Sequence, residues 1–503
     1  MTLSWADGAV LYQVYPRAFA DADGDGIGDL PGVAARLDHL AGPPDSLGVD
    51  AIWLSPFYPH GGVDGGYDVT DFTGVAPEYG TLADVDRLLA ASHGRGVRVL
   101  LDLITGHTSD RHPWFAAARA SRAAASRDWY LWADPRPGPA PPTNWVAAFG
   151  GPAWTLDPGS GQFFHHSFYS EQPDLNWRNA AVREEMAKAM RFWLDRGVDG
   201  FRVDAIEFLI KDRQLRDNPP AGPPLPPWSP EPGGLRRRRT RNQPGVAGVL
   251  RHLRRVTDEY PDRILLGELY APARQVAAAL GRARGDGLHL GLNHQLAKSG
   301  WDAKAFRRAI AAAERHLAPP LSPTWAFSNH DLSRHATRWG PERTRLAALI
   351  LLTLRGTVCL YQGEEIGMTD VAPGPRADRP RADRARRDPA RGPFDWDEAT
   401  RQRDDHESLL ALYRVLIELR RRSPAMRHGA LSLLRGLPPG VLGYQRLLGA
   451  EELTVLANMN HRPAVVRLPS GQPDVLLMAT DLHQVHPAAS RVELDADQGV
   501  VIG

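Results

Sequence analysis

Charged and polar side chains follow four apolar segments of the chain, at the points where those segments end. A charged residue in such a position is seldom buried without a partner. A single aspartate there is more often a helix cap or part of a structural ion pair, whereas several at one edge of a sheet would form a reactive cluster. The residues concerned are Asp102 and His107, Arg202 and Asp204, Glu268, and His330 and Asp331.

Two carboxyl groups in one cleft have the chemistry that glycosidic bond cleavage requires. An ionised carboxylate attacks or shields the anomeric carbon, and a protonated carboxylic acid protonates the leaving oxygen. Arg202 lies two residues before Asp204, so in a strand both side chains point to the same face, where the arginine should keep Asp204 ionised. Glu268 follows the apolar run 264–267, and apolar surroundings should raise its pKa toward that of a general acid.

A second group of oxygen ligands lies near the N-terminus. From Asp21 to Asp29, aspartates alternate with small residues, and the glycines allow a tight turn. Hard cations such as Ca²⁺ or Mg²⁺ need this arrangement of oxygen ligands. On the residues alone, a solvated acidic turn is an equally good interpretation.

Eight short apolar runs, separated by helical patterns, predict the elements that position these residues. Eight strands with intervening helices predict a (β/α)₈ TIM barrel of class α/β, whose active site lies at the carboxyl ends of the strands. The helical pattern is clearest over 180–196 and 407–422. The eight predicted strands are 11–15, 51–55, 97–104, 200–206, 264–269, 288–293, 324–328 and 357–361.

The 503 residues are too many for one compact core, so more than one structural unit is expected. The interval after the third strand is too long for an ordinary loop and predicts an inserted subdomain at 107–176. Residues 1–106 and 177–424 then form the barrel. Short alternating runs (442–447, 453–458, 464–468, 474–477 and 491–494) predict a C-terminal antiparallel β domain over 425–503.

The formal net charge of +1 argues against a general affinity for nucleic acid or for an anionic membrane. Cys359, the single cysteine, excludes an internal disulfide and lies in an apolar run, which predicts a buried structural thiol. No signal peptide and no membrane span is visible, so we expect a soluble cytoplasmic protein.

Two segments, 218–244 and 369–391, fit neither a strand nor a helix. The first contains four consecutive arginines, Arg236 to Arg239. Such a run can bind nucleic acid, but the balanced charge of the chain favours a solvated loop.

The segments that carry these residues, in this order and spacing, resemble the conserved regions of the α-amylase superfamily, glycoside hydrolase family 13, over essentially the whole chain. The resemblance implies that Asp204 is the nucleophile and that Glu268 is the general acid/base. It also implies that Asp331 is a third carboxylate, which holds the distorted sugar. Arg202, His107 and His330 match residues around the glucose of the −1 subsite.

Further segments resemble the α-glucosidase and oligo-1,6-glucosidase branch of that family. These are QPDLNW with Gln172, GGYDVTD with Tyr67 and Asp68, and RRDPARGPFDW with Arg391. The resemblance implies that Tyr67 stacks on the terminal glucose while Asp68 and Arg391 close the pocket over its far hydroxyls. A closed pocket implies exo action on short substrates.

Three more positions bear on this pocket. Phe149 and Phe168 match aromatic residues of the pocket wall, although both could instead belong to the core of the inserted subdomain. Ala205 directly follows the nucleophile, and in this branch a small residue there goes with α-1,4 cleavage, whereas valine goes with α-1,6 cleavage.

The branch also binds a structural cation in the loop that matches 21–29. The resemblance therefore favours a Ca²⁺ or Mg²⁺ site with no role in the chemistry, and no organic cofactor. A second calcium site is not expected, because Gly106 stands where many α-amylases have an asparagine ligand. The implied ligands are Asp21, Asp23, Asp25, Asp29 and the carbonyl of Ile27.

Together these observations predict a retaining exo-acting α-glucosidase for short, preferentially α-1,4-linked substrates, working as a monomer or a homo-oligomer. A transglucosylase or a sucrose or trehalose isomerase of the same family would share the carboxylates and differ in the aglycone site. Non-catalytic partners of membrane transporters lack these carboxylates and carry a membrane span, so that reading is disfavoured.

Overall fold

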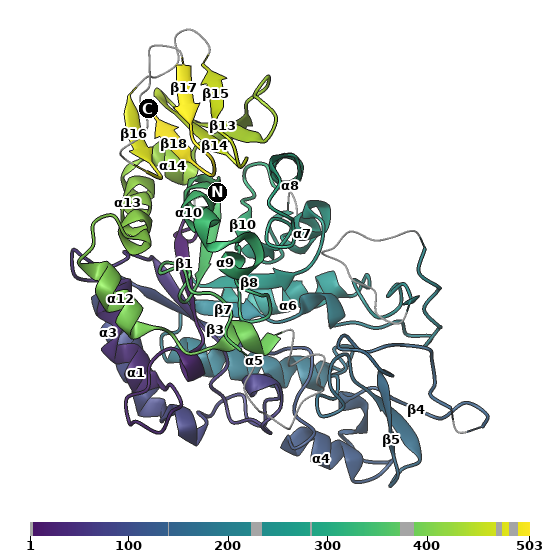
Figure 1. Ribbon diagram of the computed structural model, residues 1–503. Coiled ribbons are helices and arrows are strands. Elements are labelled where there is room, and N and C mark those ends of the chain that lie inside the picture. The colour runs from purple at the N-terminus through teal and green to yellow at the C-terminus, as the bar shows by residue number, and fades with distance from the viewer. Residues whose placement is uncertain are drawn as a thin grey trace.

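Eight parallel strands close a barrel in the order β1-β11-β10-β9-β8-β7-β3-β2 (Figure 1). The computed structural model describes residues 4–138, 140–222, 234–281, 284–372, 387–468, 475–481 and 491–503. Each of the eight predicted strands overlaps one barrel strand, which confirms the TIM-barrel prediction. The strands are β1 (Val10–Val14), β2 (Ala51–Leu54), β3 (Arg98–Leu103), β7 (Gly200–Val203), β8 (Ile264–Leu269), β9 (Leu290–Asn293), β10 (Thr324–Trp325) and β11 (Thr357–Tyr361).

The barrel interior is filled by apolar side chains that alternate along the strands with side chains facing the helices. Leu11, Trp53, Leu100 and Leu266 belong to this interior cluster and are fully buried. Cys359 lies in the same cluster as a buried free thiol, as its apolar run predicted. Because both faces of each strand are covered, the strands appear in the sequence as continuous apolar runs.

One glycine is required by the close approach of two strands. Gly200, the first residue of β7, has a φ of +149°, and a β-carbon there would lie 2.1 Å from the carbonyl oxygen of Ile264 on β8. Any larger residue would push these strands apart, directly below the ends that carry Asp204 and Glu268.

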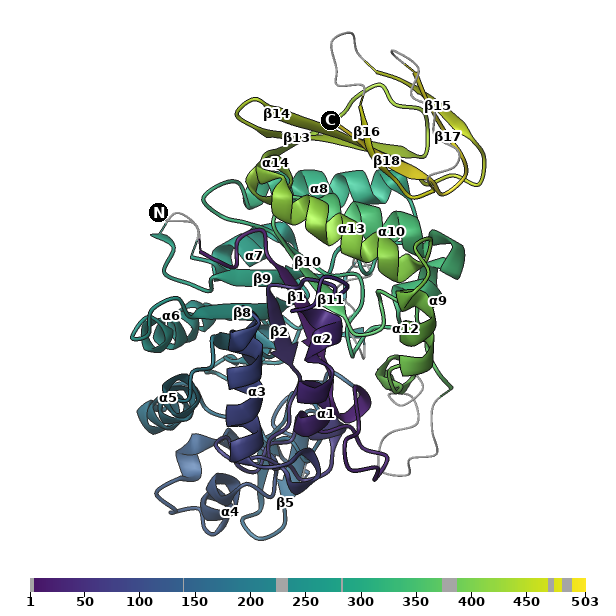
Figure 2. The ribbon, with the colours of Figure 1, turned by 90° about the vertical axis from the view of Figure 1, so that its left-hand side faces the viewer.

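Helices cover the outside of the barrel (Figure 2). Their ends carry ordinary capping signals, such as the Thr81–Asp84 capping box of α3 and the Asn179 cap of α5. The predicted helices 180–196 and 407–422 correspond to α5 and α13. In the described part of the chain, the helices outside the inserted segment are α1 (Leu30–Ala35), α2 (Leu37–Leu40), α3 (Leu82–Gly94), α5 (Ala180–Asp195), α6 (Val246–Thr257), α7 (Ala273–Ala279), α8 (Ala303–His316), α9 (His335–Trp339), α10 (Thr344–Thr353), α12 (Trp396–Arg403), α13 (Leu409–Arg422) and α14 (Pro424–His428).

The segment between β3 and β7 forms a subdomain beside the barrel, at the lower right of Figure 1. It contains α4 (Pro113–Arg119) and an antiparallel sheet of β4 (Trp132–Ala133), β6 (Gln162–His165) and β5 (Trp154–Asp157). A small core of its own includes Trp145, Trp154 and Phe163. The expected insertion after the third barrel strand is therefore present.

A buried ion pair ties this subdomain to the loop that follows β7. Asp174 contacts Lys211 and lies 3.1 Å from Nδ1 of His165, and all three side chains are almost completely buried. Burial alone would raise the pKa of Asp174, but Lys211 and His165 outweigh it and hold that pKa well below its usual range. The carboxylate is therefore ionised inside the protein.

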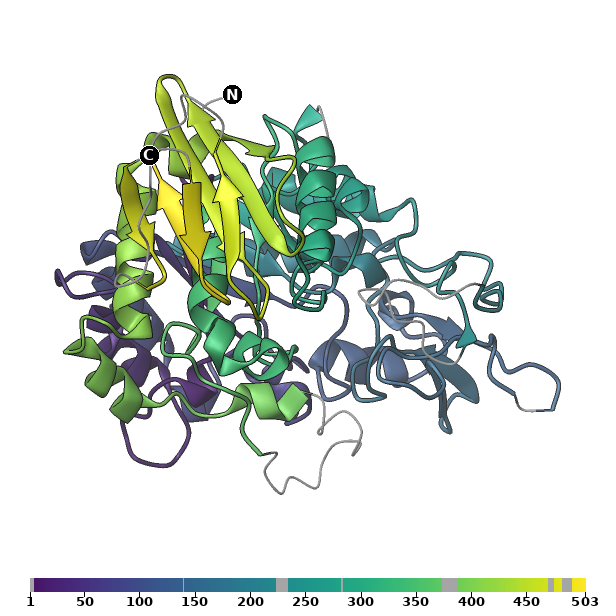
Figure 3. The same cartoon turned by 45° about the horizontal axis from the view of Figure 1, so that its top comes forward.

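The C-terminal part forms the predicted antiparallel β domain (Figure 3). A five-stranded sheet has the order β12-β13-β14-β18-β16, and β15 pairs with β17. Of the predicted runs, 474–477 begins at a residue outside the described part of the chain, and β12 and β18 had no predicted run. The strands are β12 (Ala430–Leu433), β13 (Val441–Leu448), β14 (Glu451–Asn458), β15 (Ala464–Arg467), β16 (Leu476–Ala479), β17 (Arg491–Leu494) and β18 (Gly499–Ile502).

The parts of 218–244 and 369–391 that can be assessed are 218–222, 234–244, 369–372 and 387–391; the remainder lies outside the described residues. The second segment ends in a short 3₁₀ turn, Asp388–Arg391. Among the described helices, none is long and apolar enough to cross a membrane.

Candidate active site

A cavity of about 140 Å³ opens at the carboxyl ends of the barrel strands. Residues at or after the ends of seven different strands reach it, as expected for a barrel site. The lining includes Tyr67, His107, Asp204, Ala205, Glu268 and Asp331, together with Asp64, Ala148, Phe149, Phe168, Glu207, Phe208, Arg237, Arg241, Tyr270, Lys298, Leu332 and Arg387.

Three carboxyl groups meet at the guanidinium group of Arg202. Nη1 of Arg202 lies 2.7 Å from Oδ1 of Asp102 and 2.8 Å from Oδ1 of Asp204. Nη2 of the same side chain lies 2.8 Å from Oε1 of Glu268. Arg202 is fully buried, with its guanidinium 4.8 Å from the ring centre of Trp53. The structure thus brings Asp204 and Glu268 together, side by side on one cation.

Burial dominates the ionisation of this cluster. It raises the pKa of Asp204 to about 7 and that of Glu268 to about 7, and Arg202 opposes both shifts. The upward shift for Glu268 agrees with the prediction from its apolar surroundings. The prediction that Arg202 would keep the pKa of Asp204 low is wrong, because burial and the neighbouring carboxylates outweigh one shared cation. One guanidinium beside three acids favours retention of a proton in the cluster.

Asp331 has the opposite electrostatic environment. It lies 2.6 Å from Nη2 of Arg391 and 3.2 Å from Nη1 of Arg387. Burial alone would raise its pKa, but His330, Arg387 and Arg391 together hold the pKa of Asp331 well below its usual range. A permanently ionised carboxylate therefore faces the same cavity as two carboxyl groups that can carry a proton.

Tyr67 and His330 form a stacked wall beside these carboxylates. Their ring centres are 5.1 Å apart with an interplanar angle of 4°, and the hydroxyl of Tyr67 donates to Oδ2 of Asp102 over 2.8 Å. Nε2 of His107 lies 2.9 Å from the carbonyl oxygen of Tyr67. Burial lowers the pKa of both His107 and His330, so both imidazoles are neutral near pH 7.

Asp68 was predicted to close the pocket, but Asp64, for which no role was predicted, lies at the cavity instead. Asp68 is fully buried outside the cavity lining, where Oδ1 accepts from the amide of Val63 over 3.0 Å, and burial raises its pKa to about 8. Asp64 lines the cavity instead and pairs with Arg387 at 2.7 Å. A left-handed turn at Asp64 (φ 57°) and Gly65 (φ 65°) separates the two side chains.

Arg391 and Gln172 also lie outside the cavity lining and contact residues that belong to it. Arg391 donates through Nε to the carbonyl of His330 over 2.9 Å, in addition to its ion pair with Asp331. The amide of Gln172 donates to Oδ2 of Asp64 over 3.3 Å. Gln172 and Arg391 therefore hold Asp64 and Asp331, which line the cavity. Arg387, which sequence reasoning missed, lines the cavity itself.

Phe149 and Phe168 both face the cavity and are not part of the subdomain's own core cluster. Their ring centres are 5.5 Å apart, and Phe168 lies 5.3 Å from the ring of His107. The guanidinium of Arg387 lies 4.2 Å from the ring centre of Phe149. The subdomain thus supplies an aromatic wall opposite the barrel strands.

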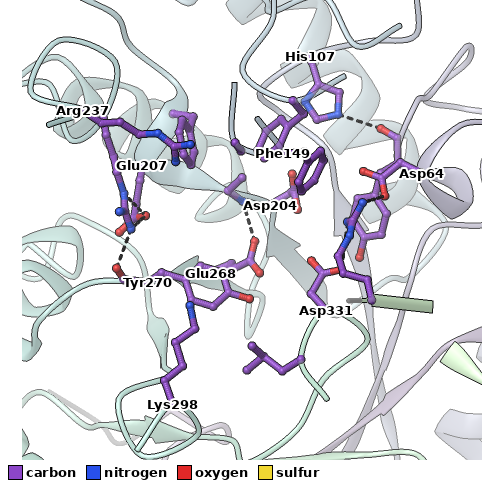
Figure 4. Close-up of a pocket in the computed structure, with 18 residues that line it drawn as sticks. Asp64, His107, Phe149, Asp204, Glu207, Arg237, Glu268, Tyr270, Lys298 and Asp331 are labelled. Atoms are coloured by element: carbon purple, nitrogen blue, oxygen red, sulfur yellow. Dashed lines mark hydrogen bonds and ion pairs between the residues drawn. The ribbon is translucent and has the colours of Figure 1, made fainter. Parts of the chain in front are cut away.

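Figure 4 shows Asp204 and Glu268 between two groups of side chains. Asp64, His107 and Asp331 lie on one side, and the other side carries Glu207, Arg237, Tyr270 and Lys298. Sequence reasoning missed this second group as site residues, although Tyr270 immediately follows β8 and was a detectable candidate.

The arginine run does not behave as a solvated loop throughout. Arg237 lines the cavity, donates to the carbonyl of Ala147 over 3.0 Å, and lies 5.5 Å from the ring centre of Phe208. Arg238, next to it, is exposed. The expectation of a solvated loop is therefore wrong for Arg237, because the inserted subdomain packs against this part of the loop.

Ala205 connects the two proton-carrying residues through its backbone. Its amide donates to Oε2 of Glu268 over 3.1 Å, and its φ of 41° and ψ of 42° lie in the left-handed region that L-residues rarely adopt. Strain of this kind clusters at functional sites.

Carboxylate oxygens of Asp21, Asp23 and Asp29 lie within 4.8 Å of one another in the first barrel loop. Calcium–oxygen distances of about 2.3–2.6 Å place opposite ligands about 5 Å apart, so the spacing fits such an ion. Asp29 also caps α1 by accepting from the amide of Gly32 over 2.6 Å. Asp25 lies outside this group of three and accepts from the amide of Ile27 over 2.7 Å.

Comparisons with known proteins agree with this geometry. The family described as "Alpha amylase, catalytic domain" matches residues 13–429. A "Probable alpha-glucosidase" of Rhizobium meliloti (strain 1021) is 38% identical over 509 residues, covering 92% of this chain and 91% of that protein. An "Oligo-1,6-glucosidase" of Parageobacillus thermoglucosidasius is 32% identical and covers 92% of each chain.

Among solved structures, the alpha-glucosyl transfer enzyme XgtA superposes with a TM-score of 0.91 at 35% identity, covering 99% of both chains. The trehalulose synthase MutB superposes with a TM-score of 0.88 at 29% identity and the same coverage.

Proposed function

This chain belongs to the alpha-amylase family and is a glycoside hydrolase of the α-glucosidase branch, and on that basis we propose that it is a retaining, exo-acting α-glucosidase for short substrates. The single observation that carries the proposal is the sharing of Arg202 by Asp204 and Glu268. One carboxylate and one carboxylic acid, held side by side beside a small cavity, are the two groups that a retaining mechanism uses.

In the proposed first step, Asp204 attacks the anomeric carbon of the terminal glucose and forms a covalent bond to it. The bond from that carbon to the glycosidic oxygen breaks, and the proton of Glu268 goes to the departing oxygen. In the second step, a water molecule gives its proton to Glu268 and attacks the same carbon, which releases Asp204. Two inversions leave the configuration of the product unchanged.

Asp331 would contribute through its permanent charge. Arg387 and Arg391 lie beside it and hold its pKa well below the usual range, which favours the ionised form. A fixed acceptor of this kind suits hydrogen bonds to glucose hydroxyls, and such bonds strengthen as the ring distorts toward the transition state.

Exo action is supported by an ion pair that closes one side of the cavity. Asp64 and Arg387 form an ion pair 2.7 Å long there, beside Tyr67 and His107. A sugar chain that continued past the terminal glucose would have to break this pair. We therefore propose that one glucose unit fills this side and that the aglycone lies on the other side of Asp204 and Glu268.

A preference for α-1,4 over α-1,6 linkages is proposed from Ala205, whose methyl group lines the cavity next to Asp204. An α-1,6 bond has an extra rotatable carbon, so its aglycone approaches along another path. Differences of one or two methyl groups are worth about 1–3 kcal/mol in selectivity. Initial rates on maltose and isomaltose measure this preference directly, and faster cleavage of isomaltose contradicts it.

A second candidate function is glucosyl transfer or isomerisation, favoured by the similarity to XgtA and to a trehalulose synthase. Such an enzyme would share the first step and give the glucosyl group to a sugar hydroxyl instead of water. Product analysis with concentrated maltose and with sucrose separates the two functions: glucose alone indicates hydrolysis, and new oligosaccharides or sucrose isomers indicate transfer.

We also propose that the loop 21–29 binds a structural Ca²⁺ or Mg²⁺. The spacing of the Asp21, Asp23 and Asp29 oxygens supports this. Asp25 and the carbonyl of Ile27 would complete the ligand set in the same loop. A cation there neutralises the clustered acids and holds the first barrel loop in place.

The anomeric form of the first product tests the main proposal. Proton NMR of a p-nitrophenyl α-glucoside digest at early times should show α-glucose before mutarotation, because this aglycone contributes no glucose of its own. Initial β-glucose would exclude the retaining route, and the absence of any cleavage of maltose, isomaltose, sucrose, trehalose or kojibiose would overturn the proposed activity.

A further inference from the structure

Glu207 is an acid of the cavity that the mechanism above does not use. It lies on the short 3₁₀ helix Ile206–Phe208, three residues after Asp204, and only 2% of its surface is exposed. Figure 4 shows it on the side of the cavity opposite Asp64 and His107, together with Arg237, Tyr270 and Lys298.

The two oxygens of Glu207 have different surroundings. Oε2 accepts from Nε of Arg241 over 2.7 Å, and Nη2 of Arg241 donates onward to the carbonyl of Tyr270 over 2.6 Å. Oε1 is buried and has no hydrogen-bond partner among the residues that the structure describes. A buried carboxylate oxygen without a donor is costly, so its partner is expected to come from the cavity.

We propose that Glu207 Oε1 accepts a hydrogen bond from a hydroxyl group of the aglycone and selects substrates whose leaving group is itself a sugar. This inference rests on the proposed function. Glu268 protonates the leaving oxygen, so the aglycone lies beyond it, away from the Asp64–Arg387 pair. Glu207 and Tyr270 occupy that side, and Tyr270 follows Glu268 by only two residues.

The aromatic ring of Tyr270 forms part of the same side of the cavity. Tyr270 lines the cavity, and its ring stacks on His294 with centres 4.5 Å apart and an interplanar angle of 18°. Nζ of Lys298 lies 3.9 Å from the centre of the Tyr270 ring. His294 and Lys298 thus hold the Tyr270 ring in place on the same side of the cavity as Glu207.

The charge of Glu207 explains why a hydroxylated aglycone is preferred over an apolar one. A hydroxyl satisfies Oε1 with a charge-assisted hydrogen bond, whereas a methyl or alkyl aglycone leaves the oxygen without a donor. Sites built to hydrogen-bond a substrate reject analogues that lack the donor, because the buried polar group is then left unpaired.

The test compares kcat/KM for maltose with kcat/KM for methyl α-glucoside, which has no aglycone hydroxyl. In Glu207→Ala the ratio of the two constants should fall about tenfold to hundredfold, the loss expected for one hydrogen bond to a charged group. Glu207→Gln keeps an acceptor oxygen and should show a smaller fall. The matched control is Glu314→Gln on α8. It removes the carboxylate that pairs with Arg355 and should leave the ratio unchanged.

The outcomes separate this inference from the proposed function. If the wild-type protein cleaves both glucosides and the Glu207 variants lose activity equally on both, Glu207 only supports the wall and the inference fails while the function stands. If the wild-type protein cleaves neither, both fail. If the alanine variant does not fold, the glutamine variant decides: an unchanged ratio overturns the inference and a reduced ratio supports it.

Discussion

The backbone amide of Ala205 donates to Oε2 of Glu268 over 3.1 Å, so the residue next to one proposed catalytic carboxylate directly binds the other. In this arrangement the backbone of Ala205 is left-handed, with a φ of 41°. The two carboxyl groups are therefore linked twice, through the Arg202 guanidinium and through one peptide group.

Substitutions at Ala205 should separate backbone strain from substrate selection. Ala205→Gly should raise the free energy of unfolding by about 1 kcal/mol, because glycine adopts positive φ without the cost that a β-carbon brings. Ala205→Val should lower it, since β-branched residues tolerate this region least, and should shift the rate ratio toward isomaltose. Urea unfolding and initial rates on maltose and isomaltose measure both effects. A valine variant as stable as the wild type would contradict the strain assignment.

Replacing either raised-pKa acid by its amide should abolish activity and stabilise the fold. Asp204→Asn and Glu268→Gln should each lose at least ~10²–10⁴-fold in kcat/KM. Because burial raises both pKa values to about 7, these two groups bind more protons in the folded protein than in the unfolded chain between about pH 4 and 7, so their contribution to stability falls as pH rises through this range.

The amide variants should therefore gain melting temperature at pH 8 and gain little at pH 4, where both acids are protonated in the folded state. Asp397→Asn, at an exposed position of α12, is the control and should show no such pH-dependent gain. Equal melting temperatures for variant and wild type at pH 8 would contradict the assigned pKa shifts.

The pH profile should respond to Asp102, which shares Arg202 with Asp204. Activity needs Asp204 ionised, so kcat/KM rises with pH through its raised pKa, and activity falls once Glu268 loses its proton. Asp102→Asn removes a negative charge that raises the pKa of Asp204. The acidic limb should move to lower pH, on the order of one unit. An acidic limb that stays in place or moves to higher pH would show that a group other than Asp204 controls it.

The buried Lys211–Asp174 pair should matter far more for stability than a similar pair at the surface. Lys211→Met leaves Asp174 ionised inside the protein and should cost about 3–5 kcal/mol of unfolding free energy. Lys188, whose pair with Glu185 is largely exposed, gives the matched control Lys188→Met, for which little change in stability is expected. Urea denaturation measures both, and similar losses in the two variants would refute the distinction.

Removal of the proposed cation should lower Tm by a few degrees without affecting chemistry at temperatures where the fold survives. Calcium added after EDTA treatment should restore the wild-type value. Asp21→Asn should abolish the calcium response, while Asp71→Asn should retain it, because Asp71 is an exposed turn aspartate outside the loop 21–29. A Tm that chelation and calcium both leave unchanged rules the site out.

The barrel and its carboxylates were accessible from the sequence because buried parallel strands produce apolar runs and each run ends at its functional residue. Which of Asp64 and Asp68 reaches the cavity could not be predicted from the sequence, since this depends on the left-handed turn at Asp64 and Gly65. Arg237 was also inaccessible: its contact with Ala147 joins segments 90 residues apart, and nothing in a run of arginines distinguishes the one that packs inward.

The same reasoning explains the error on Asp204. Sequence spacing correctly paired it with Arg202, but the number of acids that share this cation is a property of the closed barrel. Asp102 and Glu268 come from different strands, and only their convergence reveals that one positive charge is divided among three carboxyl groups.

The pairing of β1 with both β2 and β11 has a consequence for synthesis on the ribosome. Strand β1 leaves the ribosome before the other barrel strands, yet the strand that seals its open side is made some 350 residues later, as the register of Leu11 with Cys359 shows. Until then the nascent chain exposes two unpaired strand edges, which are templates for association with other chains. Slow elongation or truncation before β11 should therefore favour aggregation and chaperone capture over a stable partial barrel.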